Sequence, residues 1–204
     1  LFYKSRLKPF NSNRCLGISH QNLNFFNKKI FKIQEKLFNQ INVIKIYFEN
    51  SLSKETLKFE KKNVSILNII KIEKLISILK KKLKKEKNFK EIKIKNNNFY
   101  NLVIKNKKFD LIFNCEKNNV LTKNFFNQSY KKDYKSEAIT CNLNHKKIIN
   151  KRAIQIFTKF GPLAFLPLSR SETAVVFSMY NKKKKYSDKE ILQIIRSYNK
   201  NYII

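Results

Sequence analysis

Hydrophobic and polar positions follow a regular pattern in one stretch of the chain. Ala153–Thr158 alternates, Leu163–Leu168 is almost wholly apolar, and Thr173–Ser178 is rich in β-branched residues. Gly161-Pro162 separates the first two runs, and the polar corner Ser169–Glu172 separates the last two. Short apolar runs bounded by such residues are typical of strands joined by tight turns. The pattern therefore predicts three adjacent strands.

Apolar residues spaced three and four apart predict three helices, because this spacing places them on one face of a helix. The first is expected at residues 20–40, after Ser19, a residue type that caps helix N-termini. The second is expected at residues 65–85. The third is expected at residues 187–199, where Ser187 and Glu190 have the spacing of a capping box. The stripes are Leu23, Phe26, Ile30, Ile33 and Leu37; Ile69, Ile72, Ile76, Leu79 and Leu83; and Ile191, Ile195 and Tyr198.

Other short runs of β-branched and aromatic residues predict further strands. The residues before Arg14 are polar and are expected to be irregular. The predicted strands are residues 43–48, 91–94, 100–104 and 109–113. Together with the helices, they predict a protein of the α/β class.

The formal charge of the chain is +31, with 45 Lys and Arg against 14 Asp and Glu. Such a charge suits a nucleic acid or an anionic membrane as partner. The favoured interpretation is compositional drift. Lys far outnumbers Arg, whose guanidinium group is the better phosphate ligand, and Ile, Asn and Phe are enriched as well. The lysines are also scattered, with short clusters only at Lys80–Lys85 and Lys182–Lys185.

Cysteine and histidine positions argue against a metal centre. Cys15, Cys115 and Cys141 are far apart and odd in number, which suits neither a zinc site nor a disulfide framework and favours a reducing compartment. His145 lies in a basic loop, where solvent exposure is expected. No apolar run reaches the ~18 residues that span a bilayer, and no signal-peptide pattern is present. The chain begins with Leu1, so we expect a piece of a longer protein.

The motif F-x-x-x-G-P-L-A-F-L-P-L-S, followed by T-x-V-V-x-S, covers residues 157–178. It resembles the middle of the FAD-dependent aromatic hydroxylases of ubiquinone biosynthesis, the 2-octaprenyl-6-methoxyphenol hydroxylase group. Three other segments resemble that family in the same order. They are Arg14–Ser19 before a helix, Tyr134–Leu143 in a strand, and Tyr186–Glu190, which is similar to a W-S-D-x-x-F helix start. The resemblance extends over residues 12–200.

The resemblance implies a partial FAD-binding domain of the dinucleotide type, joined to an antiparallel or mixed substrate-domain sheet. Residues 1–42 and 63–125 would form the FAD-binding part. Residues 43–62 and 126–204 would form the substrate-binding sheet, with a loop over residues 49–62 after the strand at 43–48. The fold expected from the resemblance is therefore that of a flavin hydroxylase without its ends.

The resemblance also implies cofactor-binding residues. Arg14 would lie near the flavin, although a solvated arginine before a helix is an equal alternative. Glu116, Asn119 and Lys123 correspond to a G-A-D-G-x-x-S-x-V-R turn that approaches the cofactor phosphates. Both glycines of that turn are replaced here, and the side chain of Lys117 would obstruct a close backbone approach. No residue is predicted to be an acid, a base or a nucleophile.

A substrate pocket wall is implied at Gly161, Pro162, Leu163, Phe165 and Pro167. This apolar face would contact the prenylated ring. For each residue taken singly, a position in an ordinary core strand is an equal alternative.

The function implied is that of a monooxygenase in which NAD(P)H reduces FAD and the flavin then activates oxygen to hydroxylate a polyprenylated phenol. Expected partners are this substrate and other proteins of ubiquinone biosynthesis. The expected location is the cytoplasm, with peripheral contact at the inner membrane. The sequence lacks a G-x-G-x-x-G turn and a downstream Gly-Asp segment, which indicates a fragment or an eroded copy that does not retain FAD alone.

Two other functions stay open. A small basic nucleic-acid-binding protein would need aromatic residues interleaved with Arg, and specific binding of nucleic acid is not expected from scattered lysines. A non-catalytic remnant would fold without a cofactor. No metal is expected in any of these cases.

Overall fold

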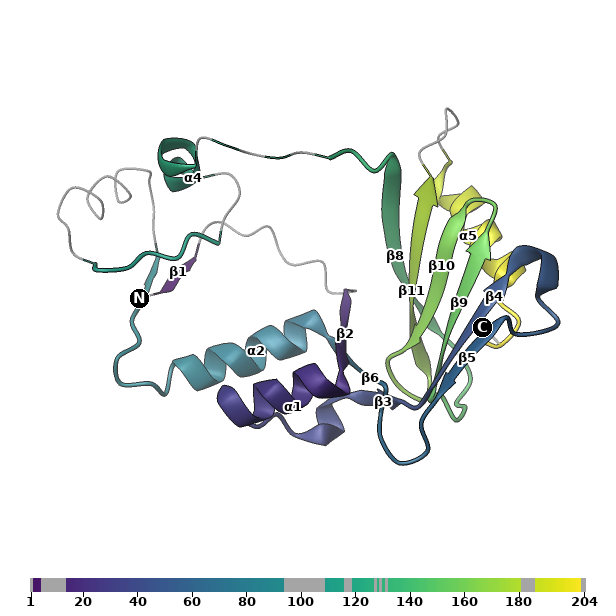
Figure 1. The fold of residues 1–204 in the computed structure, drawn as a ribbon, viewed down its shortest axis with the longest axis horizontal. Helices are drawn as coiled ribbons and strands as arrows, with labels where there is room; N and C mark the ends of the chain where they lie inside the picture. Colours follow the sequence, from purple (N-terminus) through teal and green to yellow (C-terminus); the bar gives the residue numbers. More distant parts are fainter. Residues whose placement is uncertain are drawn as a thin grey trace. The chain divides into compact units, whose positions relative to one another are not determined.

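The structure is a computed structural model that describes residues 2–4, 14–93, 109–115, 119–126, 128, 130, 132–180 and 186–202. It confirms a mixed α/β protein with antiparallel and mixed sheets (Figure 1). The chain divides into two compact units. One contains Leu1–Phe10 and Leu79–Asp133, and the other contains Asn11–Ile78 and Tyr134–Ile204. The larger unit is therefore built from two separate stretches of sequence.

A six-stranded sheet forms the centre of the larger unit. Its order is β5 (Leu57–Glu60), β4 (Val43–Phe48), β9 (Arg152–Thr158), β10 (Gly161–Pro167), β11 (Glu172–Tyr180) and β8 (Ser136–Asn144). Neighbouring strands are antiparallel except β4 and β9, which are parallel. The predicted strands at 43–48 and 134–143 and the three adjacent strands at 153–178 are confirmed.

The connection between β9 and β10 differs slightly from the predicted one. Lys159 and Phe160 form the turn, and Gly161 and Pro162 already belong to β10. Gly161 has a φ of +129°, and an added Cβ would stand 2.0 Å from the carbonyl oxygen of Ser178. Only glycine fits this position, because side chains disfavour that φ and no space is left for one.

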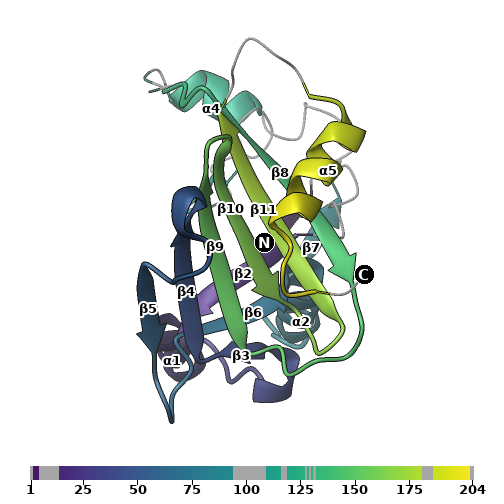
Figure 2. The same cartoon turned by 90° about the vertical axis from the view of Figure 1, so that its right-hand side faces the viewer.

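Helix α5 (Asp188–Tyr198) covers one face of the six-stranded sheet (Figure 2). Its predicted capping box is confirmed, since Ser187 accepts from the Glu190 amide and the Glu190 side chain accepts from the Ser187 amide. Ile191, Ile195 and Tyr198 are buried against the sheet. The partner residues in the strands are Leu143, Ile154, Ile156, Leu163, Phe165, Val175, Phe177 and Met179.

A second sheet of three strands also belongs to the larger unit. Its order is β2 (Cys15–Ser19), β6 (Leu67–Lys71) and β3 (Asn39–Ile41), all antiparallel. Helices α1 (His20–Lys29) and α2 (Ile72–Leu83) contribute Leu23 and Leu75 to the core cluster around Ile70 in β6. Residues 68–70 of β6 are buried because both faces of this strand are covered.

Several predicted boundaries are wrong. The helix predicted at 20–40 ends at Lys29, and the short 3-10 helix η1 (Glu35–Leu37) and β3 follow. The helix predicted at 65–85 begins only at Ile72, after β6. Residues 2–4, expected to be irregular, form a strand, and residues 15–19 form a strand that was not predicted. Residues 49–62 contain the 3-10 helix η2 (Glu49–Ser51) and β5.

In the smaller unit, β1 (Phe2–Lys4) pairs in parallel with β7 (Glu91–Lys93), which confirms a strand near the predicted 91–94. Residues 109–113 are not a strand, so that prediction is wrong, and 100–104 lie outside the described residues. Helix α4 (Val120–Phe125) belongs to the same unit. The assignment of segments to a cofactor domain and a substrate domain stays a prediction.

Candidate ligand-binding site

The six-stranded sheet has a second face, which we term the open face. Residues paired directly across a sheet point to the same side, and neighbours along a strand point to opposite sides. Leu163 and Phe165 face α5, so Pro162, Ala164 and Leu166 lie on the open face. From the strand register, the open face comprises Leu57, Phe59, Ile44, Ile46, Phe48, Ala153, Gln155, Phe157, Pro162, Ala164, Leu166, Glu172, Ala174, Val176, Ser178, Tyr180, Ser136, Ala138, Thr140, Asn142 and Asn144.

The open face contains neither Lys nor Arg, although the chain carries 45 of them. Pro162, Ala164 and Leu166 are half-buried, while Phe48 is 48% and Phe59 is 51% exposed. Partly exposed apolar positions of this extent mark a surface that binds something. The open face thus lacks the lysines that are enriched elsewhere in the sequence.

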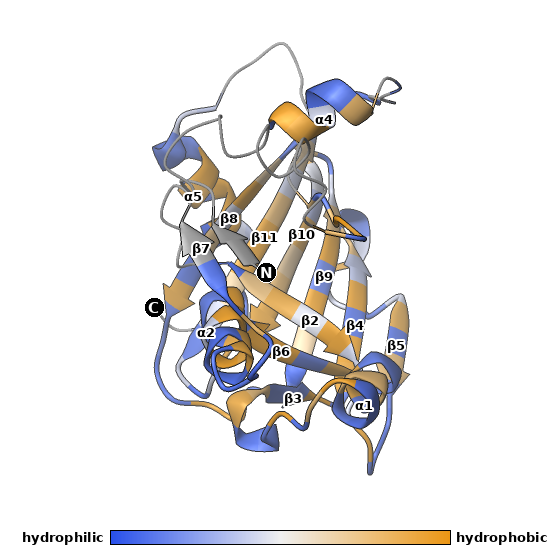
Figure 3. Ribbon diagram, turned by 90° about the vertical axis from the view of Figure 1, so that its left-hand side faces the viewer, coloured by the Kyte–Doolittle hydropathy of each residue, from blue (hydrophilic) through white to orange (hydrophobic). Residues whose placement is uncertain are grey.

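The three-stranded sheet covers one end of the open face (Figure 3). Ile41 and Ile69 pack against Ala153, together with Cys15, Ile44, Leu67, Leu166 and Leu168. The Asn39 side-chain amide donates to the Pro167 carbonyl at 3.0 Å. Lys71 Nζ lies 2.7 Å from Glu172 Oε1. These polar contacts and the apolar cluster fix the small sheet against the large one.

A cavity of about 240 Å³ opens where β2 meets the open face. It is lined by Arg14, Cys15, Thr140, Ala174, Val175 and Val176. Burial raises the pKa of the Cys15 thiol, so this cysteine stays protonated and is a poor nucleophile. The cavity thus combines one guanidinium group and one hydroxyl with apolar walls, which suits binding rather than acid–base chemistry.

Arg14, in the larger unit, lines this cavity. Asn119 and Lys123 belong to the smaller unit. Asn119 caps its own helix α4 by accepting from the Thr122 amide at 2.8 Å, and its amide group bonds to Asn114 at 2.7 Å. Glu116 lies outside the described residues. The resemblance to a phosphate-binding turn therefore has no support in the contacts of Asn119.

The predicted substrate residues divide between the two faces of β10. Leu163 and Phe165 are 0% and 2% exposed under α5, and Pro167 is buried as well. A substrate could reach them only if α5 moved away, so in this structure they are core residues. Gly161 is buried at the turn, whereas Pro162 lies on the open face. Sequence reasoning missed Ala164, Leu166 and Val176, which strand alternation alone could have assigned to the opposite face.

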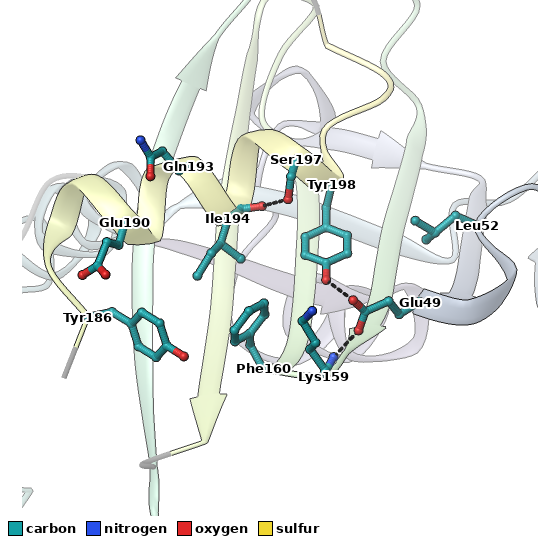
Figure 4. Close-up of a pocket in the computed structure, with 10 residues that line it drawn as sticks. All are labelled: Glu49, Leu52, Lys159, Phe160, Tyr186, Glu190, Gln193, Ile194, Ser197 and Tyr198. Carbon is teal, nitrogen blue, oxygen red and sulfur yellow. Dashed lines mark hydrogen bonds between the residues drawn. The ribbon is translucent and has the colours of Figure 1, made fainter. Parts of the chain in front are cut away.

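A second hollow lies beside α5 on the other side of the sheet (Figure 4). This groove of about 700 Å³ is lined by Glu49, Leu52, Lys159, Phe160, Tyr186, Glu190, Gln193, Ile194, Ser197 and Tyr198. Tyr198 donates to Glu49 Oε1 at 2.6 Å, and the Lys159 amide donates to Glu49 Oε2 at 2.5 Å. Both carboxylate oxygens of Glu49 are therefore occupied.

The ionisation of Glu49 and Tyr198 shows that their contact is structural. The hydrogen bond from Tyr198 lowers the pKa of Glu49, which stays charged. Burial and the hydrogen bond to Glu49 raise the pKa of Tyr198 to about 12. Both shifts move the pKa further away from neutral pH. The pair tethers α5 to η2 and supplies no acid or base.

His145 is buried, which corrects the expectation that it is solvated. Its Nδ1 lies 2.8 Å from the Lys146 carbonyl and its Nε2 lies 3.0 Å from Thr173 Oγ1. Thr173 also accepts from Asn150 at 2.9 Å, and Tyr202 donates to Asn150 at 3.3 Å. Every member of this network has a partner, so the network stabilises the end of the sheet and is not a reactive site.

Comparison with models of protein families and with curated proteins finds no match to this sequence. Among the described residues, no three His, Cys, Asp or Glu side chains gather as metal ligands would. In that same part of the chain, every helix is too short or too polar to cross a bilayer. The site must therefore be interpreted from its own geometry.

Proposed function

We propose that this chain provides the substrate-facing sheet of a flavin-dependent monooxygenase that hydroxylates a polyprenylated phenol. The open face carries the proposal: a broad apolar surface without Lys or Arg in a chain of charge +31. A phenol with an isoprenoid chain is neutral and largely apolar, so it would be stabilised by burial against such a surface.

The residues present do not fit the phosphate half of FAD. The chain has two glycines. Gly17 packs against Leu67, and Gly161 lies against the Ser178 backbone, so neither can form a phosphate-binding loop at a helix N-terminus. Asn119 is occupied at its own helix. We therefore expect no FAD to be retained by these 204 residues, and no step is assigned to the cofactor.

The chain's own residues bind and orient the substrate in this proposal. Ala164 and Val176, which are half-buried, provide small side chains on which an aromatic ring could lie. Arg14 and Thr140 at the cavity offer the polar groups that a phenol hydroxyl needs. The apolar walls exclude water from the bound ring. NAD(P)H and the flavin of that family supply the redox chemistry.

The test is titration of the purified chain with a short-chain prenylated methoxyphenol, followed by NMR of methyl groups. Ala164→Phe fills the centre of the open face and is expected to weaken binding at least about tenfold. A tenfold higher dissociation constant corresponds to a loss of about 1.4 kcal/mol in binding free energy when the ring position is blocked. Leu192→Phe adds the same ring to an exposed position of α5 and should leave binding unchanged.

Equal affinity in the two variants, or equal affinity for the phenol without its isoprenoid chain, would refute the proposed substrate. Retention of FAD through purification would separately refute the statement about phosphate binding. Nucleic-acid binding is less well supported. Surfaces that stack bases carry cationic side chains beside the aromatic rings, and no Lys or Arg of these strands points to the open face. A remnant without activity would still bind the phenol.

A further inference from the structure

Strand β5 is an edge of the six-stranded sheet, and its outer side has no partner strand among the described residues. All four of its residues are exposed. Leu57 and Phe59, on the open face, are 52% and 51% exposed. Such an edge is a template for another strand, and natural sheets usually protect it with unpaired charges, bulges or proline. β5 has only one lysine, and Lys58 is paired with Glu60.

The charge around this edge is unusual for the molecule. Residues 43–60 contain three lysines (Lys45, Lys54 and Lys58) and three glutamates (Glu49, Glu55 and Glu60), so the β4–β5 ribbon is neutral in a chain of charge +31. Lys45 pairs with Glu55 across the ribbon. Lys61 and Lys62 follow β5 directly. The ribbon itself adds no net charge, so its own charges do not oppose pairing with a second copy.

The backbone groups available for pairing can be identified. The carbonyls of Asn42 and Ile46 accept from the amides of Lys61 and Thr56, so the even-numbered residues of β4 point toward β5. Their partners in the antiparallel ladder, Phe59 and Leu57, point back toward β4. Because these groups alternate along a strand, the amide and carbonyl groups of Lys58 and Glu60 point outward.

We propose that β5 pairs antiparallel with β5 of a second copy of this chain, with Lys58 opposite the partner's Glu60 and Phe59 opposite the partner's Phe59. The two Lys58–Glu60 pairs then exchange four backbone hydrogen bonds and also form opposite-charge pairs. Registers that place Lys58 opposite Lys58, or Glu60 opposite Glu60, bring like charges together and are disfavoured. The two open faces become one continuous surface across a twofold axis.

The contact is small, so the dimer forms reversibly and depends on concentration. Sedimentation velocity over a concentration series, at about 0.15 M salt to screen the net charge, measures it. Lys58→Glu and Glu60→Lys each turn both symmetric pairs into repulsive ones, and each should raise the dissociation constant about tenfold or more. The double variant K58E/E60K restores opposite charges and should dimerise like the original chain.

Mixing provides the sharpest control. Neither single variant should self-associate, but an equimolar mixture of Lys58→Glu and Glu60→Lys should form a heterodimer, because each chain then supplies the charge that the other needs. Both substitutions lie on exposed positions, and circular dichroism checks that the fold is kept. A monomer at every concentration, or a dimer that the single substitutions leave unchanged, would overturn the proposal.

Discussion

At Gly161 the structure depends on the absence of a side chain. This residue begins β10 directly after the turn, with φ at +129°. The Thr158 hydroxyl donates to its carbonyl at 2.7 Å and accepts from the Phe160 amide at 3.1 Å, so the turn is also held by hydrogen bonds. The close approach of β11, at Ser178, leaves no room for a Cβ. The absence of a Cβ atom at residue 161 therefore allows β10 to approach β11 at Ser178.

Gly161→Ala is therefore expected to lower the free energy of unfolding by about 3 kcal/mol or more, because it adds backbone strain to a clash with rigid main chain. Urea denaturation measures the change. Gly17→Ala is the matched control and should cost about 1 kcal/mol, since its new methyl group meets only the side chain of Leu67 at 3.0 Å. Equal losses in the two variants would contradict this account.

At the scale of elements, local signals were predictable and tertiary ones were not. The motif at 153–178 and the capping box at Ser187 act over a few residues, and both are confirmed. The helix predicted at 65–85 wrongly included β6. Both faces of this strand are apolar, because Ile69 and Ile70 are buried in two different clusters. Likewise Ile33 is buried in the same cluster as Leu23 of α1, although Ile33 is not in a helix. Burial alone does not distinguish a strand from a helix when both faces are covered.

The same limit applies to the candidate site. The motif correctly drew attention to β10, but its most apolar residues, Leu163 and Phe165, are core. The smaller residues between them form the open face, and no sequence pattern says which face a helix will cover. Arg14 reaches its cavity only because β2 pairs with β6, a strand more than 45 residues later in the chain.

The tether between α5 and η2 makes a prediction about pH. Tyr198 has its pKa raised from the usual 10 to about 12, so the unfolded chain releases this proton first. Its contribution to stability is fully present below pH 10 and is lost as pH rises toward about 12. Thermal unfolding measured across this pH range should show that the Tyr198→Phe variant loses less stability between pH 10 and about 12 than the original chain does.

Glu49 acts in the opposite range. Its pKa is lowered, so its contribution is present above the ordinary value of 4.5 and is lost as pH falls below it. Glu49→Gln should flatten the acid side of the same profile. Identical alkaline profiles for the original chain and Tyr198→Phe would show that the hydrogen bond between Tyr198 and Glu49 does not stabilise α5.

At the scale of the whole molecule, the net charge of +31 and the open face act in different ways. The charge is spread over the surface and attracts any polyanion, whereas the open face is apolar and selects by shape. We therefore expect binding of duplex DNA that is independent of sequence and disappears by ~0.2 M salt, as counterion release requires.

Electrophoretic shifts with two duplexes of unrelated sequence provide the measurement. Loss of both complexes at the same salt concentration fits a general polycation effect. Binding that persists above ~0.2 M salt and prefers one duplex would instead make nucleic acid the specific partner.

The parallel pair of β4 and β9 has a consequence for synthesis on the ribosome. Residues 43–48 receive their inner neighbour only when residues 152–157 have been translated, and the stretch between them includes most of the other compact unit. Until then the inner edge of β4 is unpaired, and Ile46, Phe48 and Phe59 of the β4–β5 ribbon lack the neighbouring strand β9. The nascent chain therefore exposes part of an apolar ribbon until β9 has been made, and exposed strand edges of this kind favour aggregation.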